Sequence, residues 1–179
     1  MDFITQYLLA NSGTMVPARY TRWSAIFLLS ATAGRKVYVD HEHFQHRPIT
    51  FLCFVGDPDS KKTTAMDAAR DMYQEVFPAI PVGPSVTTRE DIVRQMSKDE
   101  FPYQNYIDES GAPQEARHYT FFVNELENFL SFNPRGMVQF LTDVYDRKFF
   151  DSSTIKHGLQ PIVNPCLNLL ACTVPDFAI

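Results

Sequence analysis

The segment from Ile49 to Phe77 restricts the fold more than any other part of the sequence, because it joins a strand to a helix through a short charged turn. Residues 49–55 form a near-continuous apolar run, of the kind found in strands buried within parallel sheets. After the turn, apolar residues at i, i+3, i+4 and i+7 spacing predict a helix from Lys62 to Phe77, which Pro78 ends. A strand that leads directly into an amphipathic helix is the repeating unit of α/β proteins.

Further strands and helices extend this alternation along the chain. Apolar strands are predicted at residues 119–123 and 165–173, and a short alternating strand at 36–40. Helices are predicted within residues 3–33 and at about 88–96. A short helix is predicted to follow Glu125 and end at about Phe132, and another to span 135–145. Residues 41–48 are predicted to be a polar connector, residues 98–117 a loop or irregular insertion, and residues 151–160 a turn or hairpin.

This pattern predicts an α/β fold with a mainly parallel sheet flanked by helices. We expect residues 1–48 to be a helical lead-in that packs on a core of residues 49–179. No helix follows the last apolar run, although a sheet of this class needs cover on both faces. The sequence therefore leaves open whether the core continues beyond Ile179.

Composition narrows the functional classes. The 179 residues are 45% apolar and include 15 Phe, which indicates one folded domain with a substantial core. The net charge of −5 gives no electrostatic footprint for sequence-independent binding to duplex DNA. No apolar run reaches the length of a bilayer span, so we expect no membrane association. Two of the three cysteines lie in very apolar segments, which favours buried free thiols in a reducing cytoplasm.

The charged turn has the form of a phosphate-binding loop. The usual pattern is G-x-x-x-x-G-K-[ST], and Gly56, Lys62 and Thr63 occupy its first glycine, its lysine and its hydroxyl position. Backbone N–H groups at the start of a helix cradle phosphate oxygens, the lysine adds a positive charge, and the hydroxyl binds Mg²⁺. The predicted cofactors are therefore ATP and Mg²⁺. The expected nucleotide contacts are Gly56, Asp57, Pro58, Asp59, Ser60, Lys61, Lys62, Thr63 and Thr64.

The loop departs from the usual pattern at Lys61, where the second glycine normally stands. A side chain there crowds the approach of the phosphates, and a left-handed backbone at this position would cost about 1–2 kcal/mol. Asp57 and Asp59 repel phosphate unless they point away from it. A charged loop before an ordinary amphipathic helix is the alternative interpretation.

Polar residues at the ends of the other two apolar strands are candidates for catalysis. Glu125 follows the strand at 119–123 and could activate water, while the preceding Asn124 could hold Mg²⁺ through a water molecule. Thr173 ends the last strand, at the sheet edge where α/β proteins bind ligands, and could sense the γ-phosphate. The alternatives are that Glu125 caps the next helix and that Thr173 only ends its strand.

Several blocks of sequence together resemble phage- and plasmid-type replication ATPases, which are P-loop proteins associated with primases or helicases. The most specific blocks are Asn-Glu-Leu-Glu-Asn-Phe-Leu at 124–130 and Asn-Pro-Cys-Leu-Asn-Leu-Leu-Ala-Cys-Thr-Val-Pro-Asp-Phe at 164–177. The likeness runs from about residue 20 to the end, and its most degenerate part is the phosphate loop.

The resemblance implies ATP binding and hydrolysis coupled to DNA replication in a phage or mobile element. It also implies a ring-shaped homo-oligomer in the cytoplasm of a bacterial host, with single-stranded DNA or other replication proteins as partners. It assigns Gly56, Lys62 and Thr63 to the phosphate site, Glu125 to the acidic site and Thr173 to the γ-phosphate sensor.

Two other functions remain open at this stage. Lys61 and Asn124 favour a degenerate P-loop subunit that binds nucleotide or supports assembly without turnover. A small-molecule kinase is the second alternative, but residues 98–117 do not show the basic lid that it would need.

Overall fold

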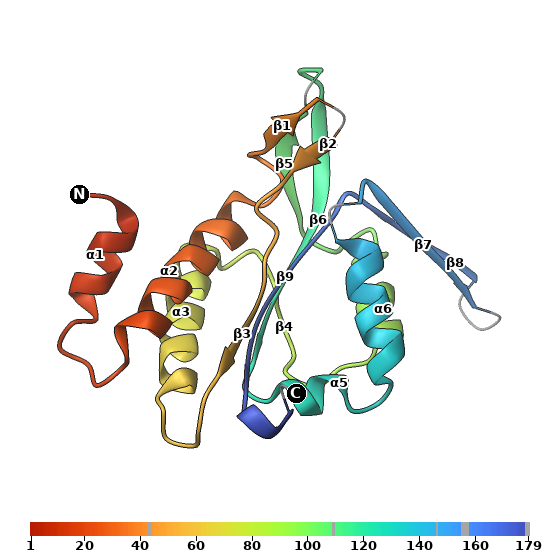
Figure 1. Cartoon of the computed structure of the whole chain (residues 1–179). Coiled ribbons are helices and arrows are strands. Elements are labelled where there is room, and N and C mark those ends of the chain that lie inside the picture. The colour runs from red at the N-terminus through yellow and green to blue at the C-terminus, as the bar shows by residue number, and fades with distance from the viewer. Residues whose placement is uncertain (43, 109, 146, 155–157, 178–179) are drawn as a thin grey trace.

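A central sheet organises the chain in the computed structural model, which describes residues 1–42, 44–108, 110–145, 147–154 and 158–177. Four parallel strands lie in the order β3 (Phe51–Val55), β9 (Pro165–Thr173), β6 (Pro113–Val123) and β4 (Val82–Gly83). A fifth strand, β5 (Tyr103–Ile107), runs antiparallel to the first half of β6. Helices flank both faces of this sheet (Figure 1). The predicted α/β class with a mainly parallel sheet is confirmed.

Two layers of helices cover the two faces. On one face lie α1 (Phe3–Ala10), α2 (Ala18–Ala33) and α3 (Lys62–Val76), and on the other lie α4 (Arg89–Met96), α5 (Leu126–Leu130) and α6 (Pro134–Val144). Successive residues of a strand point to opposite faces, so Phe122 and Leu170 join the core beneath α2 and α3, whereas Phe121 and Leu169 join the other core. Within the described ranges, no helix is both long and apolar enough to cross a membrane.

Local signals in the sequence determine several helix boundaries. The Thr88 hydroxyl caps α4 by accepting a hydrogen bond from the Asp91 backbone N–H at 3.2 Å. The Asn133 side chain caps α6 in the same way, through the Gly136 N–H at 3.0 Å, and Pro134 occupies the first turn. The predicted boundaries at about 88, 96 and 135 agree with these helices to within a residue.

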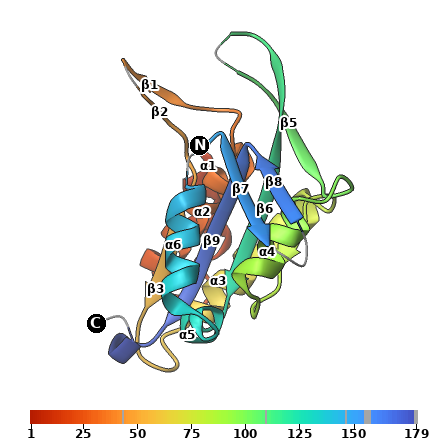
Figure 2. The ribbon, with the colours of Figure 1, turned by 90° about the vertical axis from the view of Figure 1, so that its right-hand side faces the viewer.

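Hairpins occupy both polar segments, and the prediction of a loop or irregular insertion at residues 98–117 was wrong. Residues 98–117 contain β5 and the start of β6, and residues 41–48 contain β2 (Phe44–His46), which pairs with β1 (Val39–His41). Figure 2 shows these two hairpins extending beyond one end of the sheet. A third hairpin, β7 (Phe149–Thr154) with β8 (Gly158–Val163), matches the hairpin predicted near 151–160. A short 3₁₀ turn, η1 (Pro175–Phe177), follows β9.

The burial of β3 also differs from the prediction. This apolar strand was expected to be buried on both sides, but it is the outermost strand of the described sheet, with Val55 41% exposed. As a result, Cys53 on β3 is exposed, whereas Cys166 and Cys172 on the central strand β9 are buried. Cys53 and Cys172 are free thiols. The predicted buried thiols are therefore the two on β9.

A buried histidine lies in the middle of β6, among polar side chains of the sheet. His118 is 1% exposed, and its Nε2 lies 3.4 Å from the Thr120 hydroxyl and 3.3 Å from the Asn168 side-chain amide. Burial, and to a smaller extent the nearby charge of Lys36, together lower the pKa of His118 to about 4. The imidazole is therefore neutral in the folded protein at pH 7.

We expect this histidine to make the fold sensitive to acid. Because the folded pKa lies below the unfolded value of 6.5, the unfolded chain binds more protons between pH 6.5 and 4. The free energy of unfolding should be unaffected above pH 7 and should fall by about 2 kcal/mol between pH 7 and pH 5. Urea unfolding at both pH values measures this loss, which His118→Gln should remove. An equal loss in the wild type and His118→Gln would contradict the assignment.

Candidate phosphate-binding site

The candidate residues from three different strands lie at one edge of the sheet. Val55 at the end of β3 pairs with Thr173 of β9, and Val123 near the end of β6 pairs with Ala171. Since neighbouring strands are about 4.8 Å apart, the ends of β3 and β6 are separated by about 10 Å, with β9 between them. In Figure 1 the loop after β3, the start of α5 and the end of β9 meet at the bottom of the molecule. The loop, Thr173 and Glu125 therefore share one edge, as the carboxyl ends of parallel strands must.

The loop from Gly56 to Lys61 returns the chain from β3 into α3. The Gly56 N–H donates to the Thr173 carbonyl at 3.3 Å, which ties the loop to β9. The Ser60 N–H donates to the Asp57 carbonyl at 3.3 Å and closes a turn, and α3 begins at Lys62. Asp57, Pro58 and Asp59 are exposed at this turn. The strand–loop–helix arrangement required of a phosphate loop is present.

Lys62 is directed into the loop rather than into solvent. Its side chain is 9% exposed, and its Nζ donates to the carbonyls of Gly56 at 2.9 Å and Asp57 at 3.0 Å. An ammonium has three donors, so one remains beyond these two bonds to the loop. A largely buried cation at the N-terminus of a helix is well placed to attract an anion, because the helix dipole adds partial positive charge there.

The hydroxyl side chains near Lys62 have different surroundings. Thr63 is half-buried near the Cys172 thiol, while Thr64 is exposed. Burial, as the largest cause, and the nearby Cys53 raise the pKa of Cys172 to about 12, although Thr63 and the charge of Lys62 oppose this rise. Cys172 is therefore a neutral thiol. The buried Ser60 hydroxyl has no hydrogen-bond partner among the described residues.

Lys61 has the left-handed backbone that makes its side chain costly. Its φ is 64° and its ψ is 18°, and Asp59 nearby also has a φ of 64°. Aspartate tolerates this conformation because its short polar side chain can hydrogen-bond locally, whereas lysine does not. The sequence predicted strain at Lys61 if its backbone were left-handed. The structure shows that backbone, at the position where the common pattern has glycine.

Replacing Lys61 with glycine should stabilise the protein. Glycine removes the steric cost of the left-handed backbone, and although it increases the entropy of the unfolded chain, we expect a net gain of about 1 kcal/mol. For a chain of this size, that gain corresponds to a rise of about 2–4 °C in the melting temperature. Lys61→Ala is the matched control, because it removes the charge but keeps the Cβ atom. Equal melting temperatures for the two variants would contradict the strain.

A contact from α2 explains why the loop needs glycine at position 56. The Tyr20 hydroxyl donates to the Val55 carbonyl at 3.0 Å, next to the first residue of the loop. A Cβ atom on Gly56 would lie 2.5 Å from this hydroxyl and 2.7 Å from the Ser60 Oγ. Sequence reasoning missed Tyr20, because it lies 35 residues before Val55 and belongs to no local motif.

Of the other candidate residues, Thr173 contacts the loop through its backbone carbonyl, whereas Asn124 and Glu125 form no hydrogen bond with the loop in the described part of the chain. Glu125 is exposed at the N-cap of α5; its carboxylate accepts a hydrogen bond from Asn128 and caps no backbone N–H. Asn124 is exposed, and Thr173 is buried with its hydroxyl 3.5 Å from the Val174 carbonyl. Across the described ranges, no hydrogen bond joins Asn124 or Glu125 to the loop, so Mg²⁺ binding by Thr63 and Asn124 stays a prediction.

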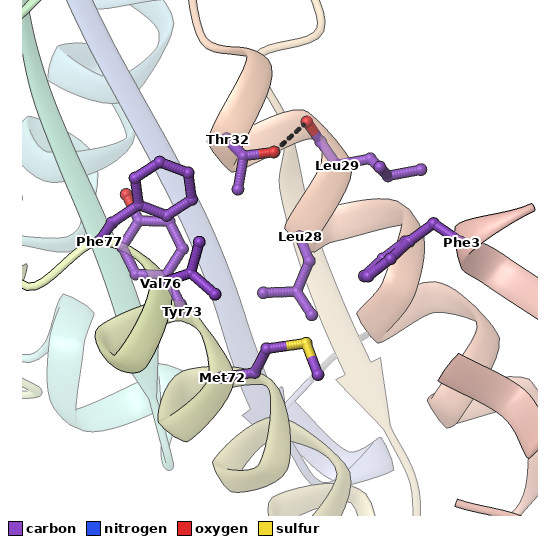
Figure 3. A pocket seen from close by; sticks show the side chains of 8 residues that line it. All are labelled: Phe3, Leu28, Leu29, Thr32, Met72, Tyr73, Val76 and Phe77. Carbon is purple, nitrogen blue, oxygen red and sulfur yellow. Dashed lines mark hydrogen bonds between the residues drawn. The ribbon is translucent and has the colours of Figure 1, made fainter. Parts of the chain in front are cut away.

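Other features of the chain do not form part of this site. An apolar cavity of about 230 Å³ lies between the C-terminal halves of α2 and α3, away from the loop (Figure 3). Its lining includes Leu28, Met72 and Phe77. The described residues contain no group of three or more His, Cys, Asp or Glu side chains that could hold a metal ion.

Comparison with known proteins does not place the chain in a family. No model of a known protein family matches the sequence, and a search of curated proteins finds no significant match.

Proposed function

We propose that this chain binds Mg²⁺-ATP at the loop from Gly56 to Thr63 and hydrolyses it, as the core of a P-loop NTPase. The observation that carries the proposal is the placement of Lys62, which is largely buried at the start of α3 and held by the Gly56 and Asp57 carbonyls. Such a lysine can contact the β- and γ-phosphates, while backbone N–H groups at the start of α3 bind the same oxygens. The Thr63 hydroxyl would be the protein ligand of the Mg²⁺ ion, whose charge would stabilise the phosphate oxygens.

The order of the strands supports hydrolysis as well as binding. With β9 between β3 and β6, the ends of these two strands lie about 10 Å apart, which leaves room for a γ-phosphate and an attacking water molecule between the loop and Glu125, two residues after β6. In this proposal Glu125 orients and deprotonates that water, and Thr173 on the intervening strand contacts the γ-phosphate. Asn124 would hold a water molecule of the Mg²⁺ ion through its amide oxygen.

The proposed biological role is DNA replication in a phage or mobile element, as part of a ring of identical subunits. This role rests on the sequence resemblance to replication ATPases at residues 124–130 and 164–177. Purified protein should show Mg²⁺-dependent ATP turnover, and single-stranded DNA should stimulate it. Turnover without stimulation by DNA would contradict the replication role while leaving the ATPase proposal intact.

A degenerate subunit that binds nucleotide without turnover is the second candidate. The strained Lys61 and the exposed amide of Asn124, at the place of the usual Mg²⁺-linked carboxylate, favour it. ATP binding together with no turnover, with or without DNA, would select this candidate.

A further inference from the structure

We propose that Arg19, at the start of α2, is an additional cation of the phosphate site and contacts the phosphate chain of the bound nucleotide. This inference rests on the proposed ATP site and extends it to a helix that precedes the loop by more than thirty residues. No phosphate-loop pattern includes this position, so only the fold brings it to the site.

Tyr20 connects the start of α2 to the loop. This residue is 5% exposed, its ring packs on Phe54 of β3 with a centroid distance of 4.9 Å, and its hydroxyl bonds to the Val55 carbonyl. The same hydroxyl occupies the space that a Cβ atom on Gly56 would need. The start of α2 is therefore fixed against the first residue of the phosphate loop.

Arg19 is held against Tyr20 by two contacts. Its guanidinium lies over the Tyr20 ring, 4.9 Å from the centroid, and its Nη2 lies 3.4 Å from the Tyr20 hydroxyl. Within the described ranges Arg19 forms no ion pair, so these contacts with an aromatic residue leave its charge uncompensated. A guanidinium has five donors in a planar fork that matches phosphate oxygens.

The charges of the loop explain why a further cation is useful there. Lys61 and Lys62 are balanced by the exposed Asp57 and Asp59, so the loop from Gly56 to Thr63 has no net charge. Lys62 also uses two of its donors on loop carbonyls. Beyond the charge of Mg²⁺, a cation outside the loop would strengthen the binding of a triphosphate. Arg19 is exposed, and its Nη2 lies 3.4 Å from the Tyr20 hydroxyl that packs against Gly56.

The test measures affinities of Arg19→Met for Mg²⁺-ATP and for inorganic tripolyphosphate by calorimetry. Methionine keeps an unbranched apolar side chain for packing on Tyr20 and removes the charge. We expect both ligands to bind about 10-fold more weakly, since one charge-assisted hydrogen bond is worth about this much. Arg22→Met is the matched control, because Arg22 is exposed one turn later on α2, beside α1, and should leave both affinities unchanged.

The outcomes separate this inference from the proposed ATP site. Wild-type affinity for both ligands in Arg19→Met would overturn the inference and leave the ATP site standing. Weaker ATP binding with unchanged tripolyphosphate binding would also overturn it, because Arg19 would then contact the nucleoside. Failure of the folded wild-type protein to bind either ligand would overturn the proposed site and this inference together.

Discussion

Replacing Glu125 with glutamine is expected to lower Mg²⁺-dependent ATP turnover at least 100-fold while leaving ATP affinity within about 2-fold of the wild type. A positioned general base contributes about 10²–10⁴-fold to the rate, and an amide of the same shape cannot accept the proton of the attacking water. The side chain is exposed and accepts a hydrogen bond from Asn128 alone among the described residues, so its replacement should not disturb the fold. Steady-state turnover and calorimetric affinity measure the two effects separately.

Glu127→Gln is the control for this variant. Glu127 lies two residues later in the first turn of α5 and is also exposed. Its replacement by glutamine changes the net charge of the protein by the same amount. Its turnover should match the wild type. Equal losses in the two variants, or a Glu125→Gln protein with normal turnover, would remove Glu125 from the proposed mechanism.

Replacing Lys62 with methionine should weaken Mg²⁺-ATP binding by about 100-fold. The variant loses a charge-assisted hydrogen bond to phosphate in a site where Lys62 is 9% exposed, and such bonds are stronger where water is excluded. Methionine keeps the length of the aliphatic stem, which limits the loss of packing at the start of α3.

The same variant also leaves the carbonyls of Gly56 and Asp57 without their donor, so its stability must be measured beside its affinity. We expect a cost of about 1–3 kcal/mol in the free energy of unfolding. Lys98→Met is the control for charge alone, because Lys98 is exposed after α4. A folded Lys62→Met protein with wild-type ATP affinity would contradict the phosphate site.

Periodic patterns in the sequence predicted most of the helices and the central strands. The spacing of apolar residues in 62–77 and the cap at Thr88 are local signals, and the structure follows both. The strand β9 was also predicted from its apolar sequence. All nine of its residues are buried, as expected of a central strand covered on both faces.

The hairpin of β5 and β6 escaped prediction because its pattern of burial does not follow its pattern of polarity. Gln104 is buried in β5, whereas the apolar Ile107 is 60% exposed. The turn between these strands has one local signal, an aspartate that accepts hydrogen bonds from nearby backbone N–H groups. Asp108 accepts hydrogen bonds from the backbone N–H groups of Ser110 and Ala112, both at 2.9 Å, as aspartate does in tight turns.

Contacts between distant segments lay beyond sequence reasoning. The exposure of β3 depends on the order of the strands, which apolar content does not reveal. The candidate phosphate loop was predicted from its own residues, but Tyr20 contacts the end of β3 beside it only because α2 packs next to α3 (Figure 1). The sequence alone does not reveal whether the Lys61 backbone is left-handed, because this depends on the geometry of the whole loop.

The most direct test of a nucleotide site at this loop is the melting temperature of the wild-type protein titrated with Mg²⁺-ATP. A ligand at 100 times its dissociation constant stabilises the folded state by about 2.7 kcal/mol, which for this size corresponds to a rise of about 5–10 °C. We predict a saturable rise with Mg²⁺-ATP, no rise with AMP, and none for Lys62→Met at the same concentrations. A cooperative melt that does not move with Mg²⁺-ATP at millimolar concentration would contradict the nucleotide site.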